Sequence, residues 1–587
     1  MKNYLLFIID SLNYSHVKSS EIELMPFCKQ IAKDSIVCDN MFSQAPYTEA
    51  AVMNIYCGQS VLENGGYIRR FADAPTTIFE VMQNAGYRTY YNSFQPQCFP
   101  SSLRRGIDDL YYNVGYDLGA LWSYRLGHYS RLLKNGELRE SDYLLLEEII
   151  EDNLTEWRIF VEKYIGGDVS CEMIAANNKA YDAQKVLSDV NKHYSEFVSD
   201  KRGYINKLLT EGTSHSLFGI PAYVQDFKIK DANVRKQLVK LFKPVMKKIR
   251  KKDFSSNMKN NKGFSKATFK QLGRFFKHPS GRTLKDFLKS AQFSLNILTD
   301  LDLKQRIDKN CDVFKSAPSA KTHIDHYVKW ASENKDKHFA CIHVDDVHNP
   351  EMFFTYDTDS VELLEKERQM ALDVISKLPK SYYGSVSHDL SLRYIDSIIE
   401  YLFEQMKSKK LLDDTCIIIT ADHGFSFAGN PVRDSFVINL YLENYNIPCY
   451  IYNSGKEAQI IDRICTSKDI PATICDLAVG ENVSGFTGHS LFEGYEYSNV
   501  MIEYCGGGCP DISRRELKIA SFDKKWFVGA LATVNDDFND DRITEIYNLE
   551  NDPRQLHNLV GKTDKMNIQY LVDVIKKRYE ELRLQTK

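Results

Sequence analysis

The sequence predicts an α/β protein with a mixed, mostly parallel sheet between helices. Two uninterrupted apolar runs, Tyr4–Ile9 and Cys416–Ala421, are typical of strands that are covered on both faces. From residue 1 to about 115, strand and helix patterns alternate, as in a helix over 78–82 followed by a strand over 87–91. Further strands are expected at 339–344, 415–420 and 449–452.

The length of 587 residues exceeds what one hydrophobic core usually organises. Between about 117 and 320 the strand patterns fade, and long helical patterns such as 143–161 replace them. We therefore expect the main domain to be divided by a large helical insertion. The four predicted parts are 1–115 and 321–495 for the main domain, 116–320 for the insertion, and 496–587 for a small C-terminal subdomain.

Positive charge is concentrated in the insertion. Residues 228–290 contain twenty Lys and Arg against three acids, although the formal net charge of the whole chain is only −4. Within them, apolar residues at helical spacing (Val234, Leu238, Leu241, Val245, Ile249) predict a basic amphipathic helix. This region is either a surface for an anionic partner or a solvated face of the scaffold.

The composition is that of a soluble globular protein, with 43% hydrophobic and 26% charged residues. The apolar stretch at the N-terminus is too short for a signal peptide, and no segment has the length of a transmembrane helix. Only Cys505 and Cys509 of the thirteen cysteines are close enough in sequence to suggest a pair. We expect a cytoplasmic protein with reduced cysteines.

Polar residues follow the two apolar runs directly. Asp10 ends the first run, and Asp422 and His423 end the second. Because ligands bind at the carboxyl ends of strands in open α/β sheets, these side chains are expected to meet at one metal ion. Two carboxylates and an imidazole suit Zn²⁺ or Mn²⁺, and less well Ca²⁺ or Mg²⁺. The alternative is that Asp10 caps a turn and Asp422 and His423 only end a strand.

A helix is predicted to begin near Thr48, after a turn that contains Pro46. The Thr48 hydroxyl would then lie at a helix N-terminus, where free N–H groups and the helix dipole favour an anion. The alternative is an N-cap threonine without a catalytic role.

With these elements the chain resembles the sulfatase branch of the alkaline phosphatase superfamily. In that branch a metal-binding aspartate ends an early strand, and a nucleophile follows Ala-Pro-x, here Ala45-Pro46-Tyr47. Thr48 to Gly58 also matches the interval between that nucleophile and a helix-ending glycine. Further collinear matches are Gly86–Thr89, Gly106–Asp108, His348–Pro350, Tyr394–Leu402, Leu412–Thr415, Asp422–Gly424, Ile470–Thr473, Gly488–Leu491, Tyr547–Leu549 and Asp552–Leu559. The resemblance covers about 1–115 and 320–587 and implies an alkaline phosphatase-like fold.

Departures from the pattern define the expected chemistry. Thr48, Ala50 and Val52 occupy the Cys/Ser-x-Pro-x-Arg signature, so the residue that sulfatases oxidise to formylglycine and its arginine are both missing. The first aspartate is followed by Ser11 rather than by a second aspartate. A threonine nucleophile resembles phosphoryl-transferring relatives, such as nucleotide phosphodiesterases and phosphoethanolamine or phosphoglycerol transferases.

The resemblance implies a metal-dependent hydrolase of phosphate esters, or less readily of sulfate esters, with Thr48 as nucleophile and metal ligand. Asp10, Asp422 and His423 would hold one divalent ion (Zn²⁺, Mn²⁺, Ca²⁺ or Mg²⁺), which activates the hydroxyl. A phosphoglycerol- or phosphoethanolamine-type transferase is the alternative, because transfer and hydrolysis share the same first step.

Other residues are assigned to the substrate. His348 matches a family His-x-Pro motif and would protonate the leaving oxygen or contact a phosphate oxygen. Asp346 and His348, with His343, could alternatively hold a second metal ion. Arg433 lies near the position of a substrate-binding lysine in relatives, and a solvated surface arginine is its alternative. His489 and the loop Gly506–Gly508 are expected to line the pocket, although a simple turn also explains the glycines.

The expected substrate is an anionic small molecule, glycan or lipid, and residues 228–290 would contact an anionic surface. A different class of function is a non-catalytic protein that binds nucleic acid or another polyanion through this Lys- and Phe-rich region. The complete set of Asp10, Thr48, Asp422 and His423 favours the enzyme.

Overall fold

The computed structural model describes residues 2–63, 74–93, 105–111, 117–167, 182–211, 240, 243–249, 266–281, 283–284, 286–288, 320–348, 361–378, 386–425, 439–480, 483–505, 512–514 and 516–585. Arg433, Gly506–Gly508, Cys509 and most of 228–290 lie outside these ranges.

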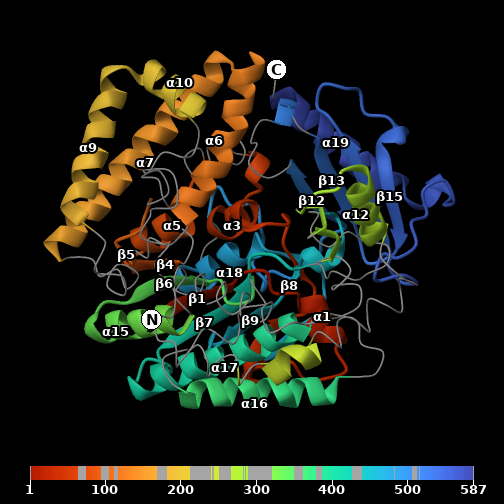
Figure 1. Cartoon of the computed structure of the whole chain (residues 1–587). Helices are drawn as coiled ribbons and strands as arrows, with labels where there is room; N and C mark the ends of the chain where they lie inside the picture. Colours follow the sequence, from red (N-terminus) through yellow and green to blue (C-terminus); the bar gives the residue numbers. More distant parts are fainter. Residues whose placement is uncertain are drawn as a thin grey trace.

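An eight-stranded sheet forms the centre of the molecule (Figure 1). Its strands lie in the order β10, β2, β9, β7, β1, β6, β4, β5. Their bounds are Gln459–Ile461, Ser35–Cys38, Cys449–Tyr452, Thr415–Ala421, Asn3–Ile9, His338–Val344, Arg88–Ser93 and Asp109–Tyr111. The predicted mixed, mostly parallel sheet is confirmed: β1 pairs in parallel with both β6 and β7, whereas β9 is antiparallel to β7 and β2.

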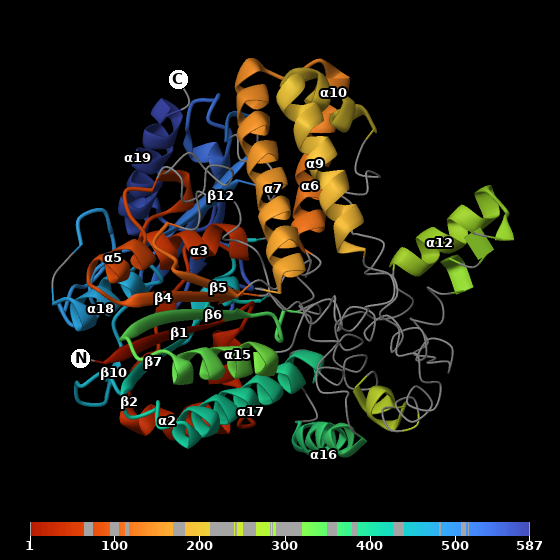
Figure 2. The ribbon, with the colours of Figure 1, turned by 90° about the vertical axis from the view of Figure 1, so that its left-hand side faces the viewer.

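The apolar runs form the middle of this sheet. The consecutive residues Tyr4–Ile9 of β1 and all residues of β7 are buried. Because successive side chains point to opposite faces, both strands are covered on both faces, as the absence of alternation predicts. Helices cover the two faces (Figures 1 and 2). On one face lie α2 (Pro26–Ile31), α15 (Ala320–Glu333) and α17 (Val386–Ser408), and on the other α3 (Thr48–Cys57), α5 (Ile78–Asn84) and α18 (Asp469–Ala478).

Smaller elements surround this core. A three-stranded sheet, β11-β3-β8, consists of Cys465–Thr466, Met41–Phe42 and Asn446–Ile447. Helix α1 (Tyr14–Ser19) follows Asp10, and α16 (Val361–Lys377) precedes α17 along the chain.

Four long helices of the insertion form a unit with a hydrophobic cluster of their own. They are α6 (Asp117–Asn135), α7 (Glu140–Gly166), α9 (Ala183–Ser199) and α10 (Lys201–Glu211), which stand together in Figures 1 and 2. The helical residues 243–249 differ from them, because Val245, Met246 and Ile249 are buried in the main core. Helix α12 (Lys266–Lys277) lies on the far side of the molecule from the N-terminus (Figure 2).

The C-terminal part forms an antiparallel four-stranded sheet, β12-β13-β14-β15, packed against helix α19. The bounds of these elements are Val500–Cys505, Leu517–Phe522, Trp526–Ala532, Ile543–Asn548 and Gln569–Gln585. A buried ion pair joins the helix to the sheet, because Arg578 donates to both carboxylate oxygens of Glu503, at 2.7 and 2.6 Å. The boundaries predicted for the four parts of the chain stay a prediction.

No helix among the described residues is long and apolar enough to cross a membrane. The nine cysteines in these ranges, Cys505 among them, are buried and form no disulfide with one another.

Two buried histidines predict a loss of stability in acid. Burial lowers the pKa of His323 in α15 to about 3 and that of His338 in β6 to about 4. Between these values and 6.5 the unfolded chain binds more protons than the folded protein, so stability falls as the pH falls below about 6.5. Lowering the pH from 7 to 5 should cost about 2 kcal/mol per histidine.

Urea unfolding of the protein at several pH values measures this effect. His338→Gln should make the pH dependence shallower, whereas His557→Gln, which changes an exposed histidine, should leave it unchanged. An unaltered slope in His338→Gln would contradict the assignment.

Candidate active site

Three adjacent strands bring the predicted metal ligands together. Asp10 follows β1, and Asp422 and His423 follow β7, whose residue Ala421 is in register with Ile9. On the other side of β1, His343 in β6 is in register with Ile8. Because all three strands are parallel, their carboxyl ends lie at one edge of the sheet, which places these four side chains together.

Thr48 is the first residue of α3, and Tyr47 occupies the N-cap position. The Thr48 hydroxyl donates to Asp10 Oδ2 at 2.9 Å, and its oxygen lies 3.4 Å from His423 Nε2. The side chain is buried. The hydroxyl is therefore directed to the strand ends and does not act as a helix cap.

Ser11 ties the two aspartates together, a role that the sequence analysis missed. Its hydroxyl donates to Asp10 Oδ1 at 2.6 Å, and its backbone N–H donates to Asp422 Oδ1 at 3.1 Å. The backbone of Ser11 is left-handed, with φ of 61°, a conformation that costs a non-glycine residue energy. The one sequence feature that could have indicated this role is the serine directly after the aspartate that ends the strand.

The His423 ring is held by a hydrogen bond between Nδ1 and the carbonyl of Gly424, at 2.7 Å. Because the carbonyl accepts, Nδ1 carries the proton and Nε2 is left with a lone pair. Nε2 lies 3.8 Å from Asp10 Oδ1 and 3.6 Å from Asp422 Oδ2. Only glycine fits at 424, since a Cβ there would lie 2.2 Å from the carbonyl oxygen of Glu443.

The site combines buried negative charge with imidazoles. Burial by itself would raise the pKa of Asp10, but His348, His423 and His343 together with the Ser11 hydroxyl bring it below its ordinary value. Burial and the neighbouring Asp10 raise the pKa of Asp422. Without a cation, one of the two carboxylates therefore gains from protonation.

The residues fit a divalent cation. Asp10, Asp422 and His343 are buried, and one ligand atom of each lies within 4.8 Å of the others. Asp422 Oδ1 accepts hydrogen bonds from two backbone N–H groups, whereas Oδ2 is buried without a hydrogen-bond partner in the described part of the chain. A buried carboxylate oxygen without a donor is costly, and a metal ion would satisfy it.

The remaining predicted residues lie in different surroundings. His348 follows β6, which ends at Val344; its side chain is 44% exposed, with Nδ1 3.6 Å from Asp345 Oδ1. The carboxylate of Asp346 accepts from the N–H of Ala320 at the start of α15. His489 stacks on Tyr495, and its N–H donates to Asp469 in α18. Arg433 lies outside the described residues.

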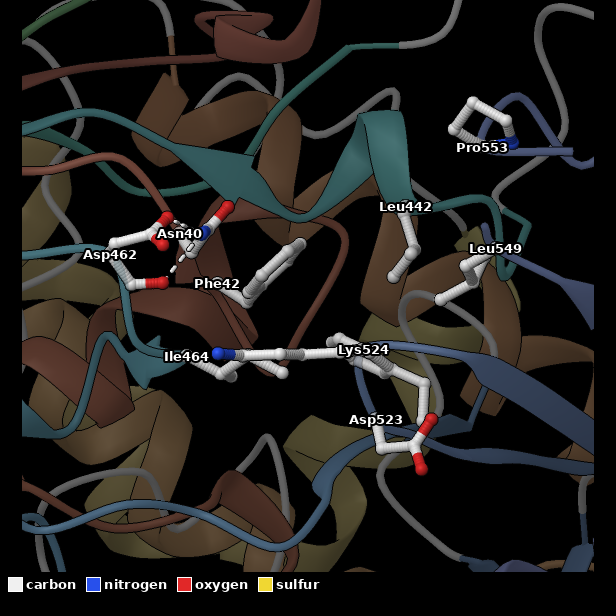
Figure 3. A pocket seen from close by; sticks show the side chains of 10 residues that line it. Asn40, Phe42, Leu442, Asp462, Ile464, Asp523, Lys524, Leu549 and Pro553 are labelled. Carbon is white, nitrogen blue, oxygen red and sulfur yellow. Dashed lines mark hydrogen bonds between the residues drawn. The ribbon is translucent and has the colours of Figure 1, made fainter. Parts of the chain in front are cut away.

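A hollow of about 320 Å³ lies between the small sheet and the C-terminal subdomain (Figure 3). Phe42, Leu442 and Ile464 line it together with Lys524 and Asp523 of the subdomain. None of the predicted site residues in the described ranges lines it.

Ser11→Ala tests whether this residue orients the aspartates. Loss of the hydroxyl removes one of the two side-chain hydrogen bonds that orient the Asp10 carboxylate, so the affinity for Mn²⁺ or Zn²⁺ should fall about 10- to 100-fold. Calorimetric titration of the metal-free protein measures the change. The control is Ser15→Ala in the neighbouring helix α1. It removes the hydrogen bond from Ser15 to Asn446 and should leave the metal affinity unchanged. Equal affinity in Ser11→Ala and the parent protein would refute this role.

Comparison with known proteins identifies the family. The sequence profile of the sulfatase family matches residues 2–152 and 250–481, which is more than half of the chain. A search of curated protein sequences finds no significant match.

Solved structures of low sequence identity share the fold. A 2-O GAG sulfatase is 10% identical with a TM-score of 0.50, and the match covers 100% of this chain and 94% of that one. The same figures hold for a predicted sulfatase from Bacteroides thetaiotaomicron. A phosphonate monoester hydrolase from Agrobacterium radiobacter is 13% identical with a TM-score of 0.47, and the match covers 100% and 96%. With its alkaline phosphatase-like fold and the family profile over most of its length, the chain belongs to the sulfatase family.

Proposed function

We propose that this sulfatase-family protein is a metal-dependent enzyme that cleaves phosphate esters with Thr48 as nucleophile. The observation that carries the proposal is the position of the Thr48 hydroxyl, which is buried at the N-terminus of α3 and bonded to Asp10 beside His423. No cysteine or serine that could become formylglycine stands there. A threonine hydroxyl has no such oxidised form, and it suits direct attack on phosphorus.

Asp10, Asp422 and His423 would hold the metal ion, with Thr48 beside them. When bound, the ion supplies Lewis acidity that lowers the pKa of a hydroxyl and balances negative charge on a phosphoryl group. Zn²⁺ and Mn²⁺ both accept this mixture of oxygen and nitrogen donors.

Three further roles fall to residues of the chain: orienting the nucleophile, binding the anion and protonating the leaving group. Asp10 Oδ2 accepts the Thr48 hydroxyl proton and so fixes the direction of the oxygen lone pairs toward the substrate. The N-terminus of α3 would favour an anion beside Thr48. His348, more exposed than His343 and His423, would give a proton to the leaving oxygen.

The reaction forms a bond between Thr48 Oγ1 and phosphorus while the bond to the leaving alcohol breaks. Water then hydrolyses the phosphothreonine, or a hydroxyl of an acceptor takes the phosphoryl group. A phosphoglycerol- or phosphoethanolamine-type transfer to an anionic glycan or lipid differs from hydrolysis only in this second step.

Turnover of three chromogenic esters tests the proposal. Metal-stripped protein is restored with Mn²⁺, Zn²⁺, Ca²⁺ or Mg²⁺ and supplied with bis-p-nitrophenyl phosphate, p-nitrophenyl phosphate or p-nitrophenyl sulfate. We expect metal-dependent cleavage of a phosphate ester and a phosphothreonine at residue 48 after acid quenching. Preferential cleavage of the sulfate, or activity that is indifferent to metal, would contradict it.

Helix α12 offers a basic surface for an anionic lipid partner. Lys270, Arg274 and Lys277 are exposed, and Phe276 beside them is 73% exposed. Basic and aromatic side chains on one helix favour the surface of an anionic membrane. Replacing the three basic residues by glutamate should abolish sedimentation with phosphatidylglycerol vesicles at low salt.

In the matched control, three exposed lysines elsewhere are replaced by glutamate: Lys562, Lys576 and Lys577. This variant should retain vesicle binding. Loss of binding in both triple variants would indicate a general charge effect, and the α12 surface would then be rejected.

A further inference from the structure

His343 occupies an unusual position for a histidine, inside the central strand β6 and fully buried. Its Nε2 lies 3.8 Å from Asp10 Oδ2 and 3.7 Å from Asp422 Oδ2. These two oxygens belong to the ends of the two neighbouring strands. His343 thus faces both carboxylates from a third strand.

The two distances are too long for hydrogen bonds, which join N and O at about 2.7–3.2 Å. They are close to the separation of two ligands on one ion, because bonds of about 2.0–2.2 Å place neighbouring ligands roughly 3–3.6 Å apart. A shift of a few tenths of an ångström would bring Nε2 to this separation from each of the two oxygens. The spacing therefore suits ligands that share one ion.

His348 differs from His343, because its side chain is 44% exposed.

We propose that His343 is a direct metal ligand and not a substrate contact. This inference rests on the proposed metal-dependent function and makes it more specific. With His423, it gives the ion two imidazoles beside the carboxylates of Asp10 and Asp422. Such a donor set selects a transition-metal ion, Zn²⁺ or Mn²⁺, over Ca²⁺ and Mg²⁺, which take oxygen ligands.

Pulsed electron paramagnetic resonance of the intact protein loaded with Mn²⁺ provides a test without mutation. Selective ¹⁵N labelling of histidine identifies the nitrogens that couple to the ion. We expect two imidazole nitrogens, from His343 and His423. Coupling to a single imidazole would overturn the proposal.

Calorimetric titration of His343→Gln provides the second test. Removal of a ligand should lower the affinity for Zn²⁺ and Mn²⁺ at least about tenfold and leave the weak binding of Ca²⁺ unchanged. His338→Gln, at the opposite end of the same strand, is the matched control. A raised KM for the phosphate ester with unchanged metal affinity would make His343 a substrate contact and refute the proposal.

The outcomes separate this inference from the function on which it rests. If the parent protein binds Mn²⁺ through one histidine and cleaves the ester, only the role of His343 fails. If it binds no transition-metal ion, both fail. If His343→Gln does not fold, the resonance experiment on the parent protein decides.

Discussion

Thr48→Ala is expected to lower the turnover of the phosphate ester by about 10⁴-fold or more, while metal affinity falls much less. In the proposed mechanism this hydroxyl forms the covalent bond, whereas Asp10, Asp422 and the histidines would remain to hold the ion. Steady-state kinetics and metal titration on the same preparations measure both effects. The acid-quenched variant should carry no phosphate at residue 48.

Thr48→Ser is the matched control, because it keeps the hydroxyl and removes only a methyl group. It should retain measurable turnover and form phosphoserine. If Thr48→Ala and the parent protein turned over at equal rates, the nucleophile would have to be another group, and the proposed mechanism would be wrong.

Asp422→Asn is expected to abolish metal binding and turnover and yet to stabilise the metal-free protein. Burial and the proximity of Asp10 raise the pKa of Asp422, so its charged form costs free energy in the folded state. The asparagine carbonyl can still accept from the N–H groups of Ser11 and His423, which bond to Oδ1 in the parent protein. The free energy of unfolding without metal should therefore rise.

Thermal unfolding with and without Zn²⁺ separates the two effects. The parent protein should be stabilised by the ion, whereas Asp422→Asn should not respond to it. Asp396→Asn is the matched control, since Asp396 is also buried but caps helix α2 through the N–H groups of Phe27 and Cys28. It should keep its response to Zn²⁺. A metal response in Asp422→Asn would contradict the proposed ligand role.

The sequence predicted the strands of the core reliably because their signal is local. An uninterrupted apolar run reports burial on both faces, and β1, β6 and β7 each formed where such a run occurs. The antiparallel direction of β9 was not predicted, since four apolar residues carry no information about strand direction. The start of α3 at Thr48 agreed with the turn signal at Pro46.

The candidate site was partly predictable for the same reason. Asp10, Asp422 and His423 directly follow apolar runs, so their place at strand ends could be read from the chain, and the family resemblance added Thr48. The role of Ser11 could not be read, because it depends on a left-handed backbone and on a neighbour 411 residues away.

The sequence by itself determined the fold class, the family, and the residue types available for chemistry at the strand ends. Only the tertiary structure decided which of them meet. His343 faces the aspartates because β6 lies next to β1 in the sheet, whereas Asp346, three residues later, bonds to the N-terminus of α15. Strand order is set by the packing of segments hundreds of residues apart, which no local pattern of residues encodes.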